Sequence, residues 1–273
     1  MSYATLLVYV NADHSSKVLV GVAANLAERF SAKLIGLSAL ATAPPVVAEG
    51  VVIVDYPTEL ELAQMRKSLA EAGDRFHAAA GMVREKEWRS ALEIPTDTLI
   101  REARCADLIV IEKGGRSINF HRALDPGTAI VGAGRPFLVV PAGVKGLLAE
   151  HILIGWKDTR EARRAIRDAL PFLHQAKRVT VMEIYEGDEE EGARQQLDDV
   201  VLYLGRHKVR AEARAEKRLM GSGADQITGF AEDEGADLLV TGGYGHSRLN
   251  EWVFGGMTHD LLASSPICCL MSH

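Results

Sequence analysis

The stretch DLLVTGGYGHSRLNEWVFGGMTHDLLASSPICCLM, Asp237–Met271, decides the fold because the chain contains it twice. The earlier copy is DLIVIEKGGRSINFHRALDPGTAIVGAGRPFLVVP, Asp107–Pro141, which lies 130 positions upstream and aligns without a gap. At this offset the copies share an aspartate, a glycine, a serine, a threonine and a proline. An internal repeat of this kind indicates two copies of one structural unit.

The beginnings of the two units also match. TLLVYVNADHSSKVLVGVAANLAERF starts at Thr5 and HILIGWKDTREARRAIRDALPFL starts at His151; each is an apolar run, a polar turn and a helical pattern. Such apolar runs are typical of strands buried on both faces of a parallel sheet, and alternation with helices indicates βαβ crossovers. The 273 residues therefore predict an α/β protein with two tandem doubly wound, Rossmann-like domains, 1–143 and 149–273.

The pattern of the second unit predicts five strands with helices between them. We expect the strands near 152–156, 179–184, 209–213, 237–241 and 267–271. The second-unit helices are expected at 189–206, in a segment that ends at 234, and in a segment that starts at about 256. In the first unit the segment Ala41–Thr58 forms a long excursion that is rich in Val, Ala and Pro. We expect this excursion to bury its apolar side chains over the carboxyl edge of the sheet.

Charge, hydropathy and cysteines exclude several classes of protein. Residues 1–145 hold 16 basic and 16 acidic side chains, so the net charge of −6 comes entirely from residues 146–273. Neither half therefore has the surplus of basic side chains that a nucleic-acid-binding protein needs. The most apolar stretch, Leu34–Val54, is interrupted by two prolines and a glutamate, and we expect no membrane association. Cys105, Cys268 and Cys269 form no CxxC pair, which favours free thiols and a cytoplasmic location.

A glycine-rich turn follows the strand expected at 237–241. It begins with Gly242, Gly243, Tyr244 and Gly245 and continues to Gly255 and Gly256, where a helix is expected to start. Glycines allow the backbone to approach a phosphate closely, and a helix N-terminus presents free N–H groups to it. In an open α/β sheet ligands bind at this edge, where the strand order reverses. A turn of this kind also occurs for purely structural reasons, and that alternative stays open.

The spacing Gly242-x2-Gly245-x9-Gly255 resembles the nucleotide-binding loop of universal stress proteins, G-x2-G-x9-G-(S/T). The resemblance extends over nearly the whole chain, in two copies, and identifies it as a tandem universal stress protein. It implies the strand order 3-2-1-4-5 in each half and ATP bound between the strands that end at Trp156 and Thr241. In that family an Asp after the first strand and an aliphatic residue after the second contact the adenosine end, and the loop holds the phosphates.

The match to that pattern is incomplete. Ile184 fits the aliphatic position, but Lys157 stands at the position of the Asp and Gly256 replaces the Ser/Thr after the last glycine. In the first half Glu112 and Asp125 replace two of the glycines, so we expect a nucleotide in the second half only. The candidate nucleotide-binding residues are Trp156, Lys157, Asp158, Ile184, Gly242, Gly243, Gly245, His246, Ser247, Gly255, Gly256 and Thr258.

Two hypotheses about function remain. In the first the protein is a stress-response regulator that binds ATP or a related adenine nucleotide, with or without Mg²⁺. In the second it is an interaction module of the same fold that binds protein partners and no nucleotide. No metal-ligand spacing and no nucleophile motif occur in the sequence, so we expect neither a resident metal nor catalytic residues, although weak ATP hydrolysis stays open.

The repeat also predicts how the halves assemble. The last strands, Phe137–Val140 and Ile267–Leu270, are apolar edges that two copies in one chain can cover mutually. We therefore expect an intramolecular pair of domains related by a pseudo-twofold axis. Further dimerisation of the whole chain stays open.

Overall fold

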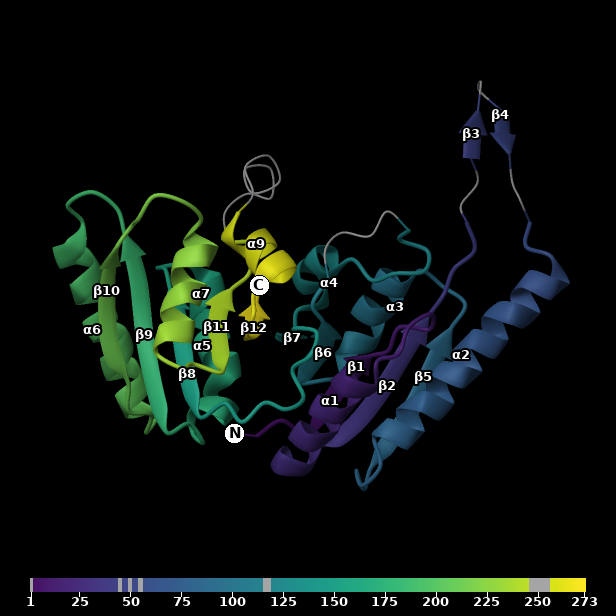
Figure 1. Ribbon diagram of the computed structural model, residues 1–273, viewed down its shortest axis with the longest axis horizontal. Coiled ribbons are helices and arrows are strands. Elements are labelled where there is room, and N and C mark those ends of the chain that lie inside the picture. The colour runs from purple at the N-terminus through teal and green to yellow at the C-terminus, as the bar shows by residue number, and fades with distance from the viewer. Residues whose placement is uncertain (1, 44–45, 49–50, 54–55, 115–118, 246–255) are drawn as a thin grey trace.

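The computed structural model describes residues 2–43, 46–48, 51–53, 56–114, 119–245 and 256–273 (Figure 1). The first half contains β1 (Thr5–Tyr9), α1 (Lys17–Phe30), β2 (Lys33–Ala39), β3 (Val46–Ala48), β4 (Val51–Ile53), α2 (Glu59–Ala79), β5 (Lys86–Ala91), α3 (Pro95–Glu102), β6 (Leu108–Glu112), α4 (Pro126–Ala133) and β7 (Phe137–Val140). The second half contains β8 (His151–Trp156), α5 (Arg160–Leu173), β9 (Arg178–Tyr185), α6 (Glu190–Arg206), β10 (Glu212–Lys217), α7 (Gly223–Asp233), β11 (Leu238–Gly242), α9 (Met257–Ser264) and β12 (Cys268–Ser272).

Ten strands form one continuous sheet in the order β10-β9-β8-β11-β12-β7-β6-β1-β2-β5. Within each half every pairing in this sheet is parallel, and the order of the strands along the chain is 3-2-1-4-5. The expected α/β class with two tandem doubly wound units is confirmed. The reversal of strand order lies between β8 and β11 in the second half, which fixes the place where a ligand site is expected.

The two halves join through their last strands, as the repeat predicts. β7 and β12 pair antiparallel, with Val139 opposite Cys269 and Leu138 opposite Leu270. Val139 and Cys269 are equivalent positions of the repeat, 130 residues apart, so the pseudo-twofold axis passes through this pair. Each strand covers an apolar edge that its partner would otherwise expose.

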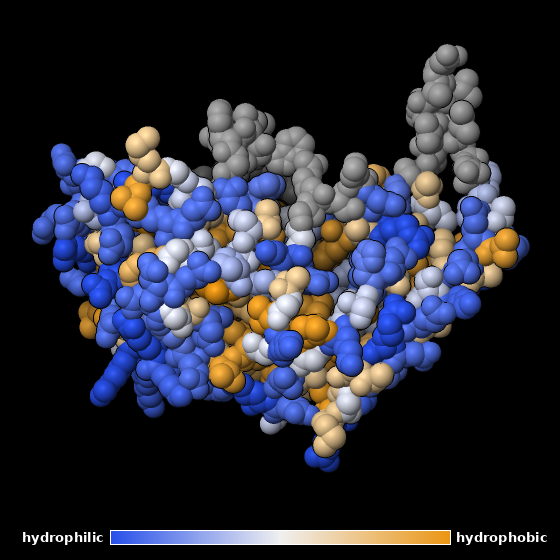
Figure 2. Space-filling model, viewed as in Figure 1, coloured by the Kyte–Doolittle hydropathy of each residue, from blue (hydrophilic) through white to orange (hydrophobic). Residues whose placement is uncertain are grey.

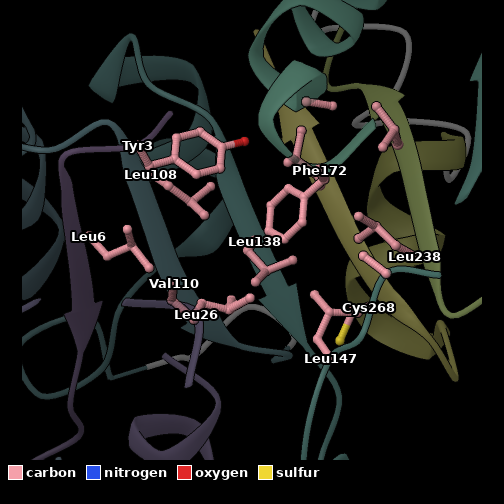
Figure 3. Close-up of a cluster of buried hydrophobic side chains, with 14 of the residues drawn as sticks. Tyr3, Leu6, Leu26, Leu108, Val110, Leu138, Leu147, Phe172, Leu238 and Cys268 are labelled. Atoms are coloured by element: carbon pink, nitrogen blue, oxygen red, sulfur yellow. The ribbon is translucent and has the colours of Figure 1, made fainter. Parts of the chain in front are cut away.

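A hydrophobic cluster runs without interruption across the junction on the face of the sheet covered by α1, α2, α5 and α6. Figure 3 shows Leu138, Phe172 and Cys268 close together within it. The rings of Phe30 and Phe172, which come from different halves, pack edge-to-face at 5.1 Å. A second cluster lies on the opposite face, under α3, α4, α7 and α9. The halves therefore share one buried core rather than touching at their surfaces.

Two expectations about local structure are wrong. The third strand of the second half is expected at 209–213, but β10 begins at Glu212. After the end of α6, Lys208 has a positive φ of 64°, and the next residue, Val209, is buried as the first apolar residue after the helix. The excursion Ala41–Thr58 contains the antiparallel hairpin β3–β4, which stands clear of the main sheet in Figure 1 rather than covering its edge. The two short strands of this hairpin satisfy backbone hydrogen bonds by pairing with each other.

The face seen in Figure 2 is mostly hydrophilic, with scattered hydrophobic residues. In the part of the chain that the structure describes, none of the helices has the length and hydropathy needed to cross a membrane.

Candidate functional site

A cavity of about 750 Å³ opens at the carboxyl ends of β8 and β11, where the strand order reverses. It is enclosed by the first turns of three helices, α5, α7 and α9. Its lining residues are Gly155, Lys157, Thr159, Glu161, Ala162, Arg218, Gly221, Ser222, Gly223, Thr241, Gly242, Gly245, Gly256, Met257, Thr258 and Asp260. All three helices direct the positive ends of their dipoles toward the same space.

The start of α5 shapes one wall of the cavity. Thr159 is the N-cap, and its Oγ1 accepts a hydrogen bond of 3.2 Å from the backbone N–H of Ala162. This cap begins the helix immediately after the turn that carries Lys157. Asp158 does not line the cavity; its side chain is half-exposed and pairs with Arg163 one turn later in the helix.

Gly242, the last residue of β11, and Gly245, in the turn that follows, both lie against the first turn of α5. A Cβ added to Gly242 would lie 2.7 Å from the backbone N of Ala162, a distance that no side chain tolerates. A Cβ added to Gly245 would lie 2.9 Å from Oε2 of Glu161. Gly242 therefore lets the strand and the helix approach each other, and Gly245 faces a carboxylate.

Glu161 is the buried acid of the site, with a relative exposure of 1%. Its Oε1 accepts a hydrogen bond from Arg160, whereas its Oε2 has no hydrogen-bond partner among the described residues. Burial raises the pKa of this carboxyl, but Arg160, the residue's own backbone N–H and the Thr159 hydroxyl together outweigh burial and leave the pKa below its ordinary value. Glu161 is therefore an ionised carboxylate at neutral pH.

Lys157 and Arg218 bring positive charge to the same cavity. Arg218 follows β10, and its Nη2 donates a hydrogen bond of 3.0 Å to the carbonyl of Gly221. Gly223, at the start of α7, lies beside the other terminal guanidinium nitrogen, Nη1. The cavity thus combines two cations and helix N-termini, which favour an anion, with the acidic residues Glu161 and Asp260, which oppose one.

The other two helix starts are linked by a side-chain contact. Ser222 is the N-cap of α7, and its hydroxyl donates to Asp260 of α9 at 2.8 Å. Gly256 is the N-cap of α9 and provides no side-chain cap. Thr258 is buried in the first turn, and its Oγ1 accepts a hydrogen bond of 3.1 Å from the N–H of Tyr244. These contacts fix the cavity wall opposite α5.

The family model of the universal stress proteins matches residues 149–273. These residues belong to the universal stress protein family. The sequence matches no curated protein significantly. Among solved structures, a universal stress protein from Archaeoglobus fulgidus is 12% identical, with 98% of this chain and 95% of that chain covered at a TM-score of 0.72. A protein of unknown function from Pseudomonas aeruginosa is 13% identical, with 99% and 92% covered at a TM-score of 0.60.

Both similarities extend over the two halves, so the whole chain has the tandem fold of a universal stress protein. At these identities the similarity concerns the fold alone. Which residues of the universal stress protein domain bind a ligand must therefore be judged from the cavity itself.

The structure brings five of the residues predicted from sequence to the cavity of the universal stress protein domain: Lys157, Gly242, Gly245, Gly256 and Thr258. It does not bring Trp156, Asp158, Ile184 or Gly243 there. His246, Ser247 and Gly255 lie outside the described residues. The main residues that sequence reasoning missed are Thr159, Glu161, Arg218, Ser222 and Asp260.

Trp156 and Ile184 point into the two hydrophobic clusters on opposite faces of the sheet. Trp156 is 9% exposed, and the interpretation as a core residue fits its place better than base stacking. Its strand neighbour in register is Glu183. Burial, the largest cause, and the negative charges of Asp158 and Glu189 together raise the pKa of Glu183 to about 7, while the positive charge of Lys157 opposes the shift.

Gly243 connects the glycine turn to the first half of the protein. A Cβ there would lie 3.2 Å from a methyl carbon of Ile130 in α4. Its neighbour Tyr244 has a positive φ of 56° and places its hydroxyl 2.5 Å from the Cβ position of Gly127 in α4. These two residues pack against the other domain rather than facing the cavity.

In the corresponding segment of the first half, Glu112 and Asp125 stand where the second half has loop glycines. Asp125 is the N-cap of α4, and its Oδ1 accepts a hydrogen bond of 3.1 Å from the N–H of Thr128. Glu112 ends β6 as an exposed residue. Gly115, the glycine that the first copy keeps, lies outside the described residues. The acid that replaces the third loop glycine therefore stabilises a helix start.

Proposed function

We propose that this universal stress protein is a stress-response regulator whose second domain binds ATP or a related adenine nucleotide in the cavity between β8 and β11. The observation that carries the proposal is the convergence of Lys157, Arg218 and three helix N-termini on one space of about 750 Å³. That volume lies within the range of small-molecule sites. A triphosphate would be attracted by both cations and by the helix dipoles.

The lining holds two cations, Lys157 and Arg218, beside two acidic residues, Glu161 and Asp260, so the phosphates would have to lie against the cations. The family pattern has an Asp where this chain has Lys157, so the contact that a carboxylate would make is lost and a cation takes its place. The amine of Lys157 can donate to a phosphate oxygen, and the guanidinium of Arg218 can do so from the other side of the cavity. We propose binding rather than catalysis, because the sequence holds no nucleophile motif.

Isothermal titration calorimetry of the intact chain with Mg-ATP tests this function. We expect one site per chain, and an affinity at least about tenfold lower in Lys157→Met and Arg218→Met, because each change removes one charge from the phosphate environment. Lys145→Met is the matched control, since this exposed lysine lies outside the cavity. Absence of binding to the intact protein, or equal affinity in all variants, contradicts the proposal.

One observation favours the second hypothesis, an interaction module without a nucleotide. The ionised carboxylate of Glu161 faces Gly245, where a bare phosphate would be repelled. A protein that releases no nucleotide on heat denaturation and does not bind Mg-ATP would act through its surface instead. In either case we propose a cytoplasmic location, which the three unpaired cysteines support.

A further inference from the structure

Part of the glycine turn lies against the other domain. Gly242 and Gly245 line the cavity, whereas the two residues between them, Gly243 and Tyr244, pack against α4 of the first domain. A Cβ added to Gly243 would lie 3.2 Å from Cγ2 of Ile130 in that helix. One short segment therefore contacts both the ligand cavity of the second domain and a helix of the first.

The backbone of Tyr244 is tied to the wall of the cavity. Its N–H donates a hydrogen bond of 3.1 Å to Oγ1 of Thr258, a buried residue that lines the cavity. Its φ of 56° lies in the left-handed region, which residues other than glycine rarely adopt. A residue with a side chain stays in that conformation only when its surroundings hold it there. The neighbours of the Tyr244 side chain therefore fix the turn.

The side chain of Tyr244 makes the contact with the first domain. Its ring packs against the hydrophobic cluster under α3, α4, α7 and α9. Its hydroxyl lies 2.5 Å from the Cβ position of Gly127, a residue of the first turn of α4. The ring occupies this place because residue 127 has no side chain.

The start of α4 is itself held in place. Asp125 caps the helix by accepting a hydrogen bond of 3.1 Å from the N–H of Thr128, and its own N–H donates one of 3.0 Å to Oγ1 of Thr96 in α3. Asp125 is also the acid that replaces the third loop glycine in the first copy of the repeat. The change that removes a loop glycine from the first domain thus stabilises the helix start against which Tyr244 packs.

The repeat does not produce this contact twice. At the offset of 130 residues, Tyr244 corresponds to Gly114, and Gly127 corresponds to Met257. No atom of the described residues lies within 4 Å of a Cβ built on Gly114. Met257 lines the cavity instead, and its methyl carbon lies 2.9 Å from the Cβ position of Gly223. Among the described residues the contact therefore runs in one direction only, from the first domain to the turn of the second.

We propose that the first domain is a scaffold that holds the glycine turn of the second domain in its binding conformation, with Tyr244 as the positioning residue and Gly127 as the residue that receives its ring. The effect on a ligand rests on the proposed function. A turn that is fixed before the ligand arrives loses less conformational freedom on binding, and this raises affinity. The proposal gives a role to the domain that has lost two of the loop glycines.

The test is the full-length variant Gly127→Ala, whose Cβ displaces the hydroxyl of Tyr244. We expect the Kd of Mg-ATP, measured by calorimetry, to rise about tenfold, within the usual range for coupling between two sites. Hydrogen exchange of the Tyr244 amide, followed by NMR, should become about tenfold faster, because its bond to Thr258 opens more often.

Two variants separate positioning from damage to α4. Gly132→Ala is the matched control, because it places a Cβ 2.7 Å from Cδ1 of Ile100, inside the first domain and away from the turn. It should leave the Kd and the exchange rate within about twofold of the natural protein. The double variant Gly127→Ala/Tyr244→Phe lacks the oxygen that clashes, and it should restore the Kd to within about threefold.

The outcomes distinguish the scaffold from the proposed function. An intact chain that does not bind Mg-ATP refutes the proposed function, and hydrogen exchange still decides whether α4 holds the turn. Unchanged exchange in Gly127→Ala, or equal effects of Gly132→Ala, refutes the scaffold. Faster exchange with an unchanged Kd refutes the link between the turn and the ligand. Failure of Tyr244→Phe to restore Gly127→Ala refutes Tyr244 as the positioning residue.

Discussion

Gly242→Ala should destabilise this protein by about 3 kcal/mol. The added Cβ would lie 2.7 Å from the backbone N of Ala162 and 2.9 Å from the carbonyl carbon and the Cβ of Glu161. These atoms belong to the first turn of α5 and cannot rotate away as the end of a side chain would. The strand β11 and the helix must therefore separate, and overpacking of a core typically costs about 1–3 kcal/mol, with backbone clashes near the upper end.

Differential scanning calorimetry and urea denaturation measure this effect. In a domain of about 150–250 residues, 1 kcal/mol corresponds to roughly 2–4 °C, so a fall in Tm of about 6–12 °C is expected. Gly229→Ala is the matched control, because this glycine of α7 has no atom within 4 Å of its Cβ position. Its helix should become more stable by about 0.5–1 kcal/mol. A Tm for Gly242→Ala within about 2 °C of the natural protein would refute the reasoning.

Gly245→Ala should have a smaller effect on stability than Gly242→Ala, because Gly245 faces a side chain and Gly242 faces helix backbone. A Cβ on Gly245 would meet Oε2 of Glu161 at 2.9 Å, the far end of a flexible side chain. Glu161 can move aside, so the loss of stability should stay below about 1 kcal/mol. The two glycines of one turn should thus differ clearly in thermal melts, although the sequence pattern treats them alike.

Three further predictions concern assembly, pH and the ligand. The halves 1–143 and 149–273, produced separately, should associate or aggregate because β7 and β12 lose their shared edge; a stable soluble monomer of each contradicts this. Burial raises the pKa of Glu183 to about 7, above its value in the unfolded chain, so its ionisation lowers stability as pH rises from about 4.5 through 7. Glu183→Gln should therefore stabilise the protein by about 1–3 kcal/mol at pH 8 and by little at pH 4.5, as urea denaturation at both pH values will show. In calorimetry with Mg-ATP, Gly245→Asp should abolish the single site and Gly115→Asp should leave it intact, whereas two sites or a site that survives Gly245→Asp would disprove the asymmetry.

The sequence alone predicted the features that depend on local pattern and on repetition. Apolar runs between polar turns, such as Leu6–Val10 and Ile152–Trp156, mark buried parallel strands because both faces of these strands are covered. The repeat at an offset of 130 predicted two domains and the pairing of Phe137–Val140 with the last strand. These conclusions need only the hydrophobic period and the unfavourable exposure of an apolar edge.

The tertiary structure alone decided which side chains share the cavity and what each glycine does. Glu161 and Arg218 lie 57 positions apart in the chain, and parallel strands bring them to one edge of the sheet. Glu161 carried a signal in the sequence, an acid on the apolar stripe of α5, but that signal does not say whether the carboxylate faces a partner or a cavity. Gly242, Gly243 and Gly245 are adjacent or nearly so, yet they pack against a helix backbone, the other domain and a carboxylate. Spacing along the chain records none of these neighbours, because each one is set by how elements distant in sequence pack against the same short turn.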